Sequence, residues 1–398
     1  MNLPLHICFI CDEYPPALHG GTGSSYRDLA EGLTAAGHRV TIVGVYSPER
    51  LKLRQPVDET INGVRVVRLP SGPKWLGHRV GTLWNRYKLR RWLAQAHAQS
   101  LLDLIEASDY AGWLRFGGPR NVSTIVRIRG SNLFFDTELG RGGDAFEHRL
   151  EREALARAKC IAAVSRYAAR RTLELCGLSD RECTVIYNAV DTAIFAPVKG
   201  VEIEAGLIVF VNSINPRKGI EQLMDAMNVV CGSHSEARLV AIGHDARKGG
   251  NQGDYVGKLL ERVRPEYRGR VTFTGRLERN TGVLDYLRKA HVCCYPSHME
   301  TFGIAAVEAM AVGKPTVFSR TGPGPEIIED GVSGLLCDPH DPADIASKIL
   351  RILENLPLAA ALGKNARCRV VQMFDKRDWV KRNLEFYENV LARKTESS

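Results

Sequence analysis

Two lengths of the chain alternate short apolar runs with segments of helical periodicity. The first starts with the apolar run 5–11, continues through a Gly-rich turn and a helical segment, and reaches a second apolar run at 39–45. The second length repeats the pattern, with apolar runs at 207–212 and 237–243 on either side of a helical segment. Such alternation is typical of doubly wound α/β domains with parallel sheets. We therefore expect two Rossmann-like domains that bind ligands at the carboxyl ends of their strands, in a cleft between them.

The length of the chain and the linker composition set the expected domain boundaries. The 398 residues suffice for about two domains of ordinary size. Residues 189–203 are rich in small and polar side chains, which is typical of a linker. We predict an N-terminal domain over 1–188, a C-terminal domain over 204–375 and a terminal helix over 376–398.

Composition and charge restrict the class of protein. No run of about 18 uncharged apolar residues occurs, and the first ten residues lack the basic region of a signal peptide. The scattered cysteines, with Cys8 and Cys11 inside an apolar run, predict buried reduced thiols and a cytoplasmic protein. The net charge of +9 fits nucleic acid, anionic membrane or phosphorylated substrates equally well. Because no nucleic-acid-binding module is recognisable, we expect no nucleic-acid partner.

The segment 291–315 has the order strand, Pro-containing turn, helix and Gly stop. Good helix formers occupy 305–310, and Gly313 follows them, so Glu300 falls in the loop before the helix and Glu308 inside it. The backbone N–H groups at 301–303 lie at the helix start, where an anionic diphosphate binds favourably. Carboxylates repel phosphate but accept hydrogen bonds from hydroxyls, which a sugar and a ribose both carry.

This segment resembles the E-x7-E signature of the retaining glycosyltransferases with the GT-B fold, in particular glycosyltransferase family 4, the group 1 glycosyltransferases. A chance pair of surface glutamates is the simpler alternative, but the matching pattern is longer than two residues. It comprises Pro296-Ser297, Glu300-x-Phe302-Gly303, Glu308-Ala309-Met310-Ala311 and Gly313-Lys314-Pro315-Thr316-Val317. The segment 184–197 is also similar to the end of the family's first domain. The resemblance implies a terminal helix that crosses back to the first domain.

The resemblance assigns roles to residues of the second domain. Glu308 would bind both ribose hydroxyls, and Glu300 would contact the sugar hydroxyls close to the reaction. The backbone N–H groups of Thr301, Phe302 and Gly303 would meet the sugar and diphosphate, and Arg276 and Leu277 would lie near the base. The implied reaction moves a sugar from a nucleotide-diphosphate sugar to an acceptor hydroxyl with retention, in glycan, polysaccharide or glycolipid biosynthesis.

The leaving diphosphate also needs positive charge. No Asp-x-Asp pair lies at a strand end, so we expect no metal and no cofactor beyond the nucleotide-sugar substrate. Arg217 and Lys218, in a turn after the strand 207–212, are the predicted cations. The family usually has a further Arg a few residues earlier, following a Gly, and this chain has Val211-Asn212-Ser213-Ile214 there.

In the first domain, Gly20-Gly21 lies in the Gly-rich turn, and Gly residues permit positive φ and close approach of a ligand to the backbone. These glycines resemble the family's first loop, which faces the donor phosphates and the acceptor. They lack the G-x-G-x-x-G spacing of a dinucleotide-binding domain, which disfavours a nicotinamide-dependent oxidoreductase. Arg129, after the strand 123–128, stands where family members often carry a His in contact with the donor sugar, and we assign it to the acceptor side. Other interpretations left open are a GT-B nucleotide-sugar 2-epimerase and a non-catalytic nucleotide-sugar-binding protein.

The segment 74–91 is basic and aromatic. It holds six basic residues interleaved with Trp75, Trp84 and Tyr87, and Trp92 follows. A helix of this kind suits the interface between water and anionic lipid. The alternative is an amphipathic helix whose Trp residues pack on the first domain and whose charges are solvated. The first interpretation predicts peripheral contact with the inner membrane face and a lipid-linked acceptor, and the second a soluble glycan acceptor.

Overall fold

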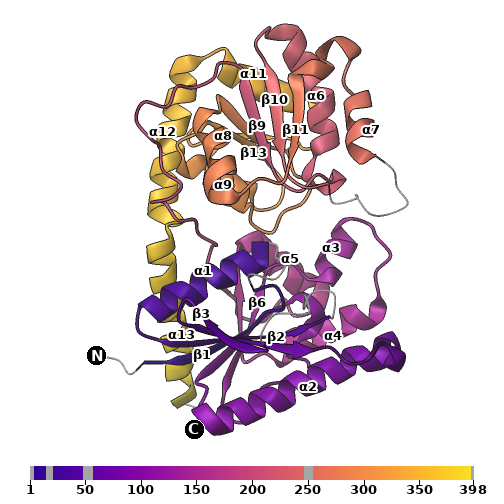
Figure 1. Ribbon diagram of the computed structural model, residues 1–398, viewed down its shortest axis with the longest axis vertical. Helices are drawn as coiled ribbons and strands as arrows, with labels where there is room; N and C mark the ends of the chain where they lie inside the picture. Colours follow the sequence, from indigo (N-terminus) through magenta and orange to yellow (C-terminus); the bar gives the residue numbers. More distant parts are fainter. Residues whose placement is uncertain (1–3, 15–20, 48–56, 246–253, 396–398) are drawn as a thin grey trace. The chain divides into compact units, whose positions relative to one another are not determined.

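The computed structural model describes residues 4–14, 21–47, 57–245 and 254–395 (Figure 1). The chain forms two compact units. Unit 1 contains residues 1–188 and 377–398, and unit 2 contains residues 189–376. The divisions lie after Asn188 and before Arg377, so residues 189–203, which we expected to form a linker, belong to unit 2.

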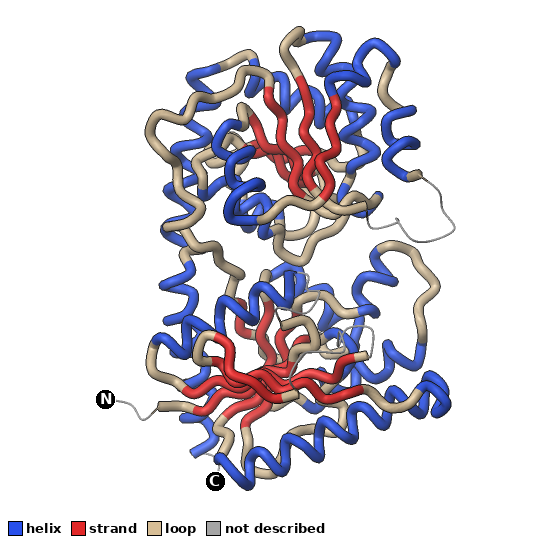
Figure 2. Tube along the Cα trace, in the orientation of Figure 1, coloured by secondary structure: helices blue, strands red, loops and turns tan. Residues whose placement is uncertain are grey.

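Unit 1 is built on an eight-stranded sheet of order β3-β4-β2-β1-β5-β6-β7-β8 (Figure 2). The strands are β1 (His6–Ile10), β2 (Arg39–Tyr46), β3 (Asp58–Ile61), β4 (Val64–Pro70), β5 (Leu104–Ser108), β6 (Ser123–Ile128), β7 (Cys160–Ala163) and β8 (Thr184–Val185). The pairs are parallel except for the hairpin β3–β4. The hairpin turn uses Asn62 at φ 50° and Gly63 at φ 80°, which is the backbone that the Asn-Gly pair predicts.

The helices of unit 1 connect these strands, and α1 and α2 lie on opposite sides of the sheet (Figure 1). They are α1 (Gly21–Ala35), α2 (Gly77–Ser100), α3 (Asn132–Glu138), α4 (Ala145–Arg157) and α5 (Arg166–Cys176), and the chain ends in α13 (Lys376–Thr395), which connects no strands. Side-chain caps fix several starts. For example, Ser165 Oγ accepts the N–H of Ala168 at 3.0 Å, which begins α5 directly after β7.

Unit 2 has a six-stranded parallel sheet of order β11-β10-β9-β12-β13-β14. Its strands are β9 (Leu207–Val211), β10 (Arg238–Ile242), β11 (Val271–Gly275), β12 (Val292–Tyr295), β13 (Thr316–Ser319) and β14 (Leu335–Cys337). Its helices are α6 (Ile220–Ser233), α7 (Tyr255–Glu261), α8 (Leu284–Lys289), α9 (Ile304–Ala311), α10 (Gly324–Ile327), α11 (Pro342–Leu353) and α12 (Leu356–Met373). One apolar core joins α6, the central strands and α11.

The terminal helix α13 is held to the sheet of unit 1 by a buried polar network. Glu106 on β5 and Arg127 on β6 form a bidentate ion pair. Arg127 Nε donates to Glu106 Oε1 at 2.6 Å, and Arg127 Nη2 donates to Glu106 Oε2 at 2.8 Å. From α13, Asn383 Oδ1 accepts from Arg127 at 2.7 Å, and Tyr387 Oη donates to Glu106 at 2.8 Å. All four side chains are at most 1% exposed. The chain therefore returns to its first unit through these contacts.

The state of the cysteines and the character of the helices can be compared with what the sequence predicts about the thiols and about membrane spans. Each of the ten cysteines is free, and Cys8 and Cys11 are buried, as expected from their apolar run. Burial raises the pKa of the Cys8 thiol to about 12. Among the described residues, no helix combines the length and the apolar character needed to cross a membrane.

Candidate active site

The turn after β9 carries the two predicted cations. It forms a short 3-10 helix, Pro216–Lys218, and ends at Gly219 with φ 69°. A β-carbon at residue 219 would collide with the carbonyl oxygen of Pro296, so glycine is required for the turn to approach the segment after β12. The N–H of His298 donates to the carbonyl oxygen of Arg217 at 2.9 Å, which fixes the two segments to each other.

This approach brings Lys218 and Glu300 together, although 82 positions separate them in the sequence. Lys218 Nζ lies 2.5 Å from Glu300 Oε1, and the two side chains are 9% and 15% exposed. Ser297 Oγ donates to the same carboxylate oxygen at 3.2 Å. Burial lowers the pKa of Lys218, although Glu300 opposes that effect. Burial alone would raise the pKa of Glu300, but the positive charges of Lys218 and Arg217 outweigh it, so this pKa is lowered.

The loop between Glu300 and α9 ends at Gly303, which has φ 101°. A β-carbon there would press into the ring of Phe318 on β13, so this glycine allows the helix start to lie against the sheet. Phe302 is buried and Thr301 is half-buried. The order strand, turn and helix predicted for this segment is confirmed, with Glu300 in the loop and Glu308 inside α9.

Glu308 is 5% exposed and forms an ion pair with Arg279. Arg279 begins a π-helical turn, Arg279–Val283, that follows the predicted base-contacting residues Arg276 and Leu277. Its guanidinium also lies over the Phe195 ring, 5.1 Å from the centroid. Sequence reasoning missed Arg279, because a single Arg in a loop ordinarily points into solvent. Its position two residues after Leu277 was the only available signal.

The remaining predicted residues belong to unit 1. Gly21 is the first residue of α1 and is exposed, whereas Gly20 lies outside the described residues. Arg129 follows β6 and is 8% exposed. The predicted residues of unit 2 thus form two groups, Arg217 and Lys218 with Glu300, and Arg276 and Leu277 beside the pair Arg279–Glu308.

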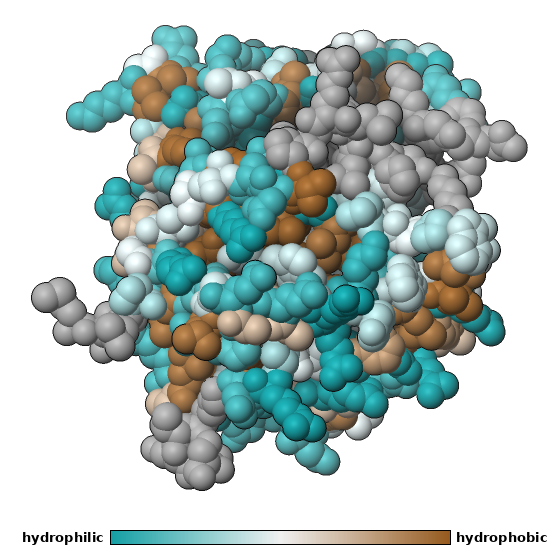
Figure 3. All heavy atoms as spheres, turned by 60° about the horizontal axis from the view of Figure 1, so that its bottom comes forward, coloured by the Kyte–Doolittle hydropathy of each residue, from teal (hydrophilic) through white to brown (hydrophobic). Residues whose placement is uncertain are grey.

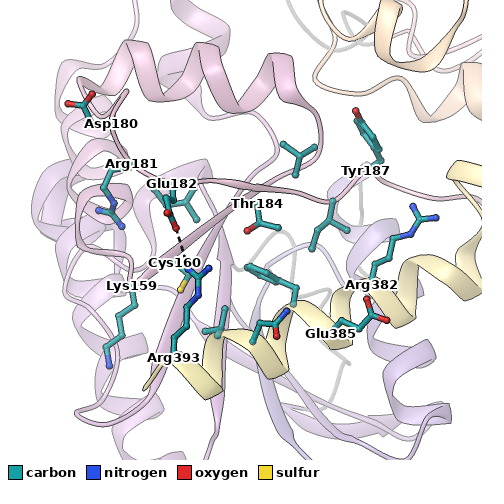
Figure 4. Close-up of a pocket in the computed structure, with 16 residues that line it drawn as sticks. Lys159, Cys160, Asp180, Arg181, Glu182, Thr184, Tyr187, Arg382, Glu385 and Arg393 are labelled. Atoms are coloured by element: carbon teal, nitrogen blue, oxygen red, sulfur yellow. Dashed lines mark hydrogen bonds and ion pairs between the residues drawn. The ribbon is translucent and has the colours of Figure 1, made fainter. Parts of the chain in front are cut away.

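A pocket of about 640 Å³ also opens in unit 1, between the edge strand β8 and α13 (Figure 4). Its lining mixes both signs of charge, and the ion pair of Arg393 with Glu182, at 3.3 Å, passes beside Cys160. None of the predicted site residues lines this pocket. The candidate active site is therefore defined by the contacts of Glu300 and Glu308 and not by this cavity.

The predicted basic and aromatic stretch begins in a 3-10 turn, Lys74–Leu76, and continues in helix α2, and both interpretations of it need correction. Arg86 is 4% exposed and donates to Glu147 at 3.0 Å, so it is neither solvated nor available to lipid. Trp75 and Trp84 are 82% and 46% exposed, so they do not pack into the core of unit 1. The side chain of Lys74 lies outside the described residues.

Two parallel-sheet α/β units, with paired carboxylates around a helix start in the second, define the GT-B class of glycosyltransferase fold. Family models match almost the whole chain: "Glycosyltransferase Family 4" over residues 19–194 and "Glycosyl transferases group 1" over residues 196–369. The chain belongs to the group 1 glycosyltransferases of family 4.

Similar proteins agree with this assignment. An uncharacterized glycosyltransferase of Methanocaldococcus jannaschii is 26% identical, over 96% of this chain and 98% of its own length. A glycogen synthase of Mycobacterium tuberculosis is 29% identical, over 93% and 91%.

Solved structures show the same fold. A sucrose-phosphate synthase from Thermosynechococcus elongatus superposes with a TM-score of 0.81 and 25% identity, over 98% of this chain and all of its own. The Anabaena protein HepE, solved with UDP and glucose, superposes with a TM-score of 0.76 and 20% identity, over 97% and 100%.

Proposed function

We propose that this glycosyltransferase moves a sugar from a nucleotide-diphosphate sugar to an acceptor hydroxyl with retention of the anomeric configuration. The observation that carries the proposal is the buried Lys218–Glu300 pair directly before the start of α9. A cation, a carboxylate and a helix N-terminus at one place suit a ligand that combines a diphosphate with hydroxyl groups.

The pairs Lys218–Glu300 and Arg279–Glu308 each have a role when the donor is bound. Lys218 and Arg217 neutralise the diphosphate, and Glu300 accepts hydrogen bonds from the sugar hydroxyls. Glu308 accepts hydrogen bonds from the ribose hydroxyls, and the neighbouring Arg279 supplies the counter-charge for this buried carboxylate. Backbone N–H groups at 301–303 meet the diphosphate, and Arg276 and Leu277 lie beside the base.

We propose the following course for the reaction. The bond between the anomeric carbon and the phosphate oxygen breaks while the acceptor oxygen bonds the same face of that carbon. The acceptor proton passes to the leaving phosphate oxygen, so no protein nucleophile is required. The enzyme contributes by orienting the two substrates and by stabilising the charge that develops on the diphosphate.

The direct test is incubation of the protein with radiolabelled nucleotide sugars and a panel of glycan and lipid-linked acceptors. UDP sugars come first, because HepE was solved with UDP. We expect release of the nucleotide and transfer of label to one acceptor class, with the anomeric configuration of the product assigned by NMR. An inverted product would contradict retention. Nucleotide-sugar epimerisation without transfer, or binding without turnover, would favour the two alternative functions instead.

We further propose that α2 attaches the enzyme to an anionic membrane surface. Val80, Trp84, Tyr87 and Arg91 follow one another at helical spacing, and all four are exposed. Arg90 is exposed beside them, and α2 contains no acidic residue. The face of the molecule in Figure 3 is mostly hydrophilic, with smaller hydrophobic groups between. Exposed aromatic side chains next to positive charge suit the headgroup region of anionic lipid.

Co-sedimentation with vesicles tests this attachment. Wild-type protein should bind anionic but not neutral vesicles, and binding should weaken as salt rises. Each Arg near such a surface contributes about 1 kcal/mol, so replacing Arg90 and Arg91 with Gln should weaken binding by roughly 30-fold. Lys381→Gln with Arg382→Gln, two exposed basic residues on α13, is the matched control and should bind like wild type. Protein that stays in the supernatant at low salt would exclude the membrane contact and favour a soluble acceptor.

A further inference from the structure

Arg129, which the proposed mechanism leaves without a task, is buried at the carboxyl end of β6. One of its terminal nitrogens, Nη1, donates to Ser25 Oγ at 2.9 Å and to Asn188 Oδ1 at 3.2 Å. The guanidinium also lies over the Tyr26 ring, 4.5 Å from the centroid. These contacts fix the plane of the guanidinium, and they provide acceptors for the N–H groups of Nη1.

The other side of the guanidinium presents Nε and Nη2, and neither has an acceptor among the described residues. The same two nitrogens hold a carboxylate in other arginines of this chain. Arg127 binds Glu106 in this way at 2.6 and 2.8 Å, and Arg65 binds Asp58 at 3.1 and 2.7 Å. In Arg129 this two-nitrogen fork is unfilled.

The carboxylate of Asp109 lies near Arg129, but it accepts hydrogen bonds from backbone groups and not from the guanidinium. Its oxygens accept the backbone N–H groups of Arg129, at 2.9 Å, and of Gly130, at 3.3 Å. Within the described part of the chain, Arg129 forms no ion pair. A buried cation with unmet N–H donors is costly, and a planar fork of two N–H groups matches the oxygens of a carboxylate or phosphate.

We infer that the Arg129 fork binds an oxyanion, phosphate or carboxylate, on the acceptor substrate. The inference rests on the proposed function, because the donor diphosphate is assigned there to Arg217 and Lys218 in unit 2, which leaves Arg129 of unit 1 for the acceptor side on which the sequence analysis expects it. The Arg129 fork would then select acceptors that bear a negative charge.

Inorganic phosphate is the minimal probe for this fork. The unfolding midpoint is measured against phosphate concentration at constant ionic strength, with UDP at saturation so that the diphosphate site in unit 2 is occupied. We expect a phosphate-specific rise for wild type, and an apparent Kd for phosphate at least tenfold higher in Arg129→Gln. Arg65→Gln, whose fork is filled and exposed, should respond like wild type. No rise for wild type, or an undiminished rise in Arg129→Gln, would overturn the inference.

Two further measurements separate this site from the donor site and from a folding defect. Arg129→Lys keeps the charge without the fork and should bind phosphate more weakly than wild type, even if Arg129→Gln folds poorly. The affinity for UDP should be unchanged in Arg129→Lys but reduced in Glu308→Gln. Weakened UDP binding in Arg129→Lys would assign the oxyanion to the donor and refute the acceptor assignment. Failure of wild type to bind UDP, ADP and GDP alike would instead count against the proposed function, and the phosphate titration without a nucleotide would still test the fork.

Discussion

Replacing Lys218 with alanine is expected to lower the turnover number by at least about 100-fold, equivalent to roughly 2.7 kcal/mol of transition-state stabilisation. In the structure, Lys218 is buried against Glu300 in a site with little access to water. A fixed cation there acts most strongly on the charge that develops as the sugar–phosphate bond breaks, and less on the intact donor. The Michaelis constant for the donor should therefore change less than the turnover number in steady-state kinetics.

Two companion variants sharpen this measurement. Lys218→Arg retains the charge and should recover part of the lost turnover. Lys314→Ala removes another buried lysine of unit 2, 7% exposed, that has no role in the proposed diphosphate site. It should leave the turnover number close to that of wild type if the effect at residue 218 is specific. An increase in the Michaelis constant alone for Lys218→Ala would mean that this lysine only binds the ground state.

The local order of elements around Glu300 and Glu308 could be predicted because short-range signals determine it. Gly303 and Gly313 mark the ends of α9, and the apolar run before Pro296 marks β12. The contact of Lys218 with Glu300 could be expected only in outline, from the rule that carboxyl ends of parallel strands lie at one edge. Its actual form depends on the close approach of Gly219 to Pro296, which no sequence spacing encodes.

Long-range polar pairs were beyond sequence reasoning altogether. Arg279 reaches Glu308 from another loop, and its position shows no periodicity that would mark it. Arg127 lies in the predicted strand 123–128 and Glu106 in the neighbouring strand β5, but a charge inside an apolar run is ordinarily expected at a strand end or on a solvated face. Their burial becomes intelligible only when β5 and β6 pair and α13 covers them.

Replacing Glu106 with alanine is expected to destabilise unit 1 by about 3–5 kcal/mol, because it leaves the buried guanidinium of Arg127 without its counter-charge. Asn383 and Tyr387 would also lose partners, so α13 should detach first and the amides of residues 383–390 should exchange faster with solvent. Denaturant unfolding measures the first effect and hydrogen exchange the second.

The double variant Glu106→Leu with Arg127→Met separates loss of the ion pair from the burial of an unpaired charge. It should be more stable than Glu106→Ala alone, because no uncompensated charge remains and the two apolar side chains fill the space. The exposed ion pair of Arg393 with Glu182 also holds α13 to the rest of unit 1. The control variant Arg393→Gln removes this pair and should change the free energy of unfolding little. If Glu106→Ala lowered the free energy of unfolding no more than Arg393→Gln, the buried network would not be what holds the terminal helix to the sheet. Apolar contacts would then have to hold it, such as that of Tyr387 with Phe9, whose ring centroids are 6.4 Å apart.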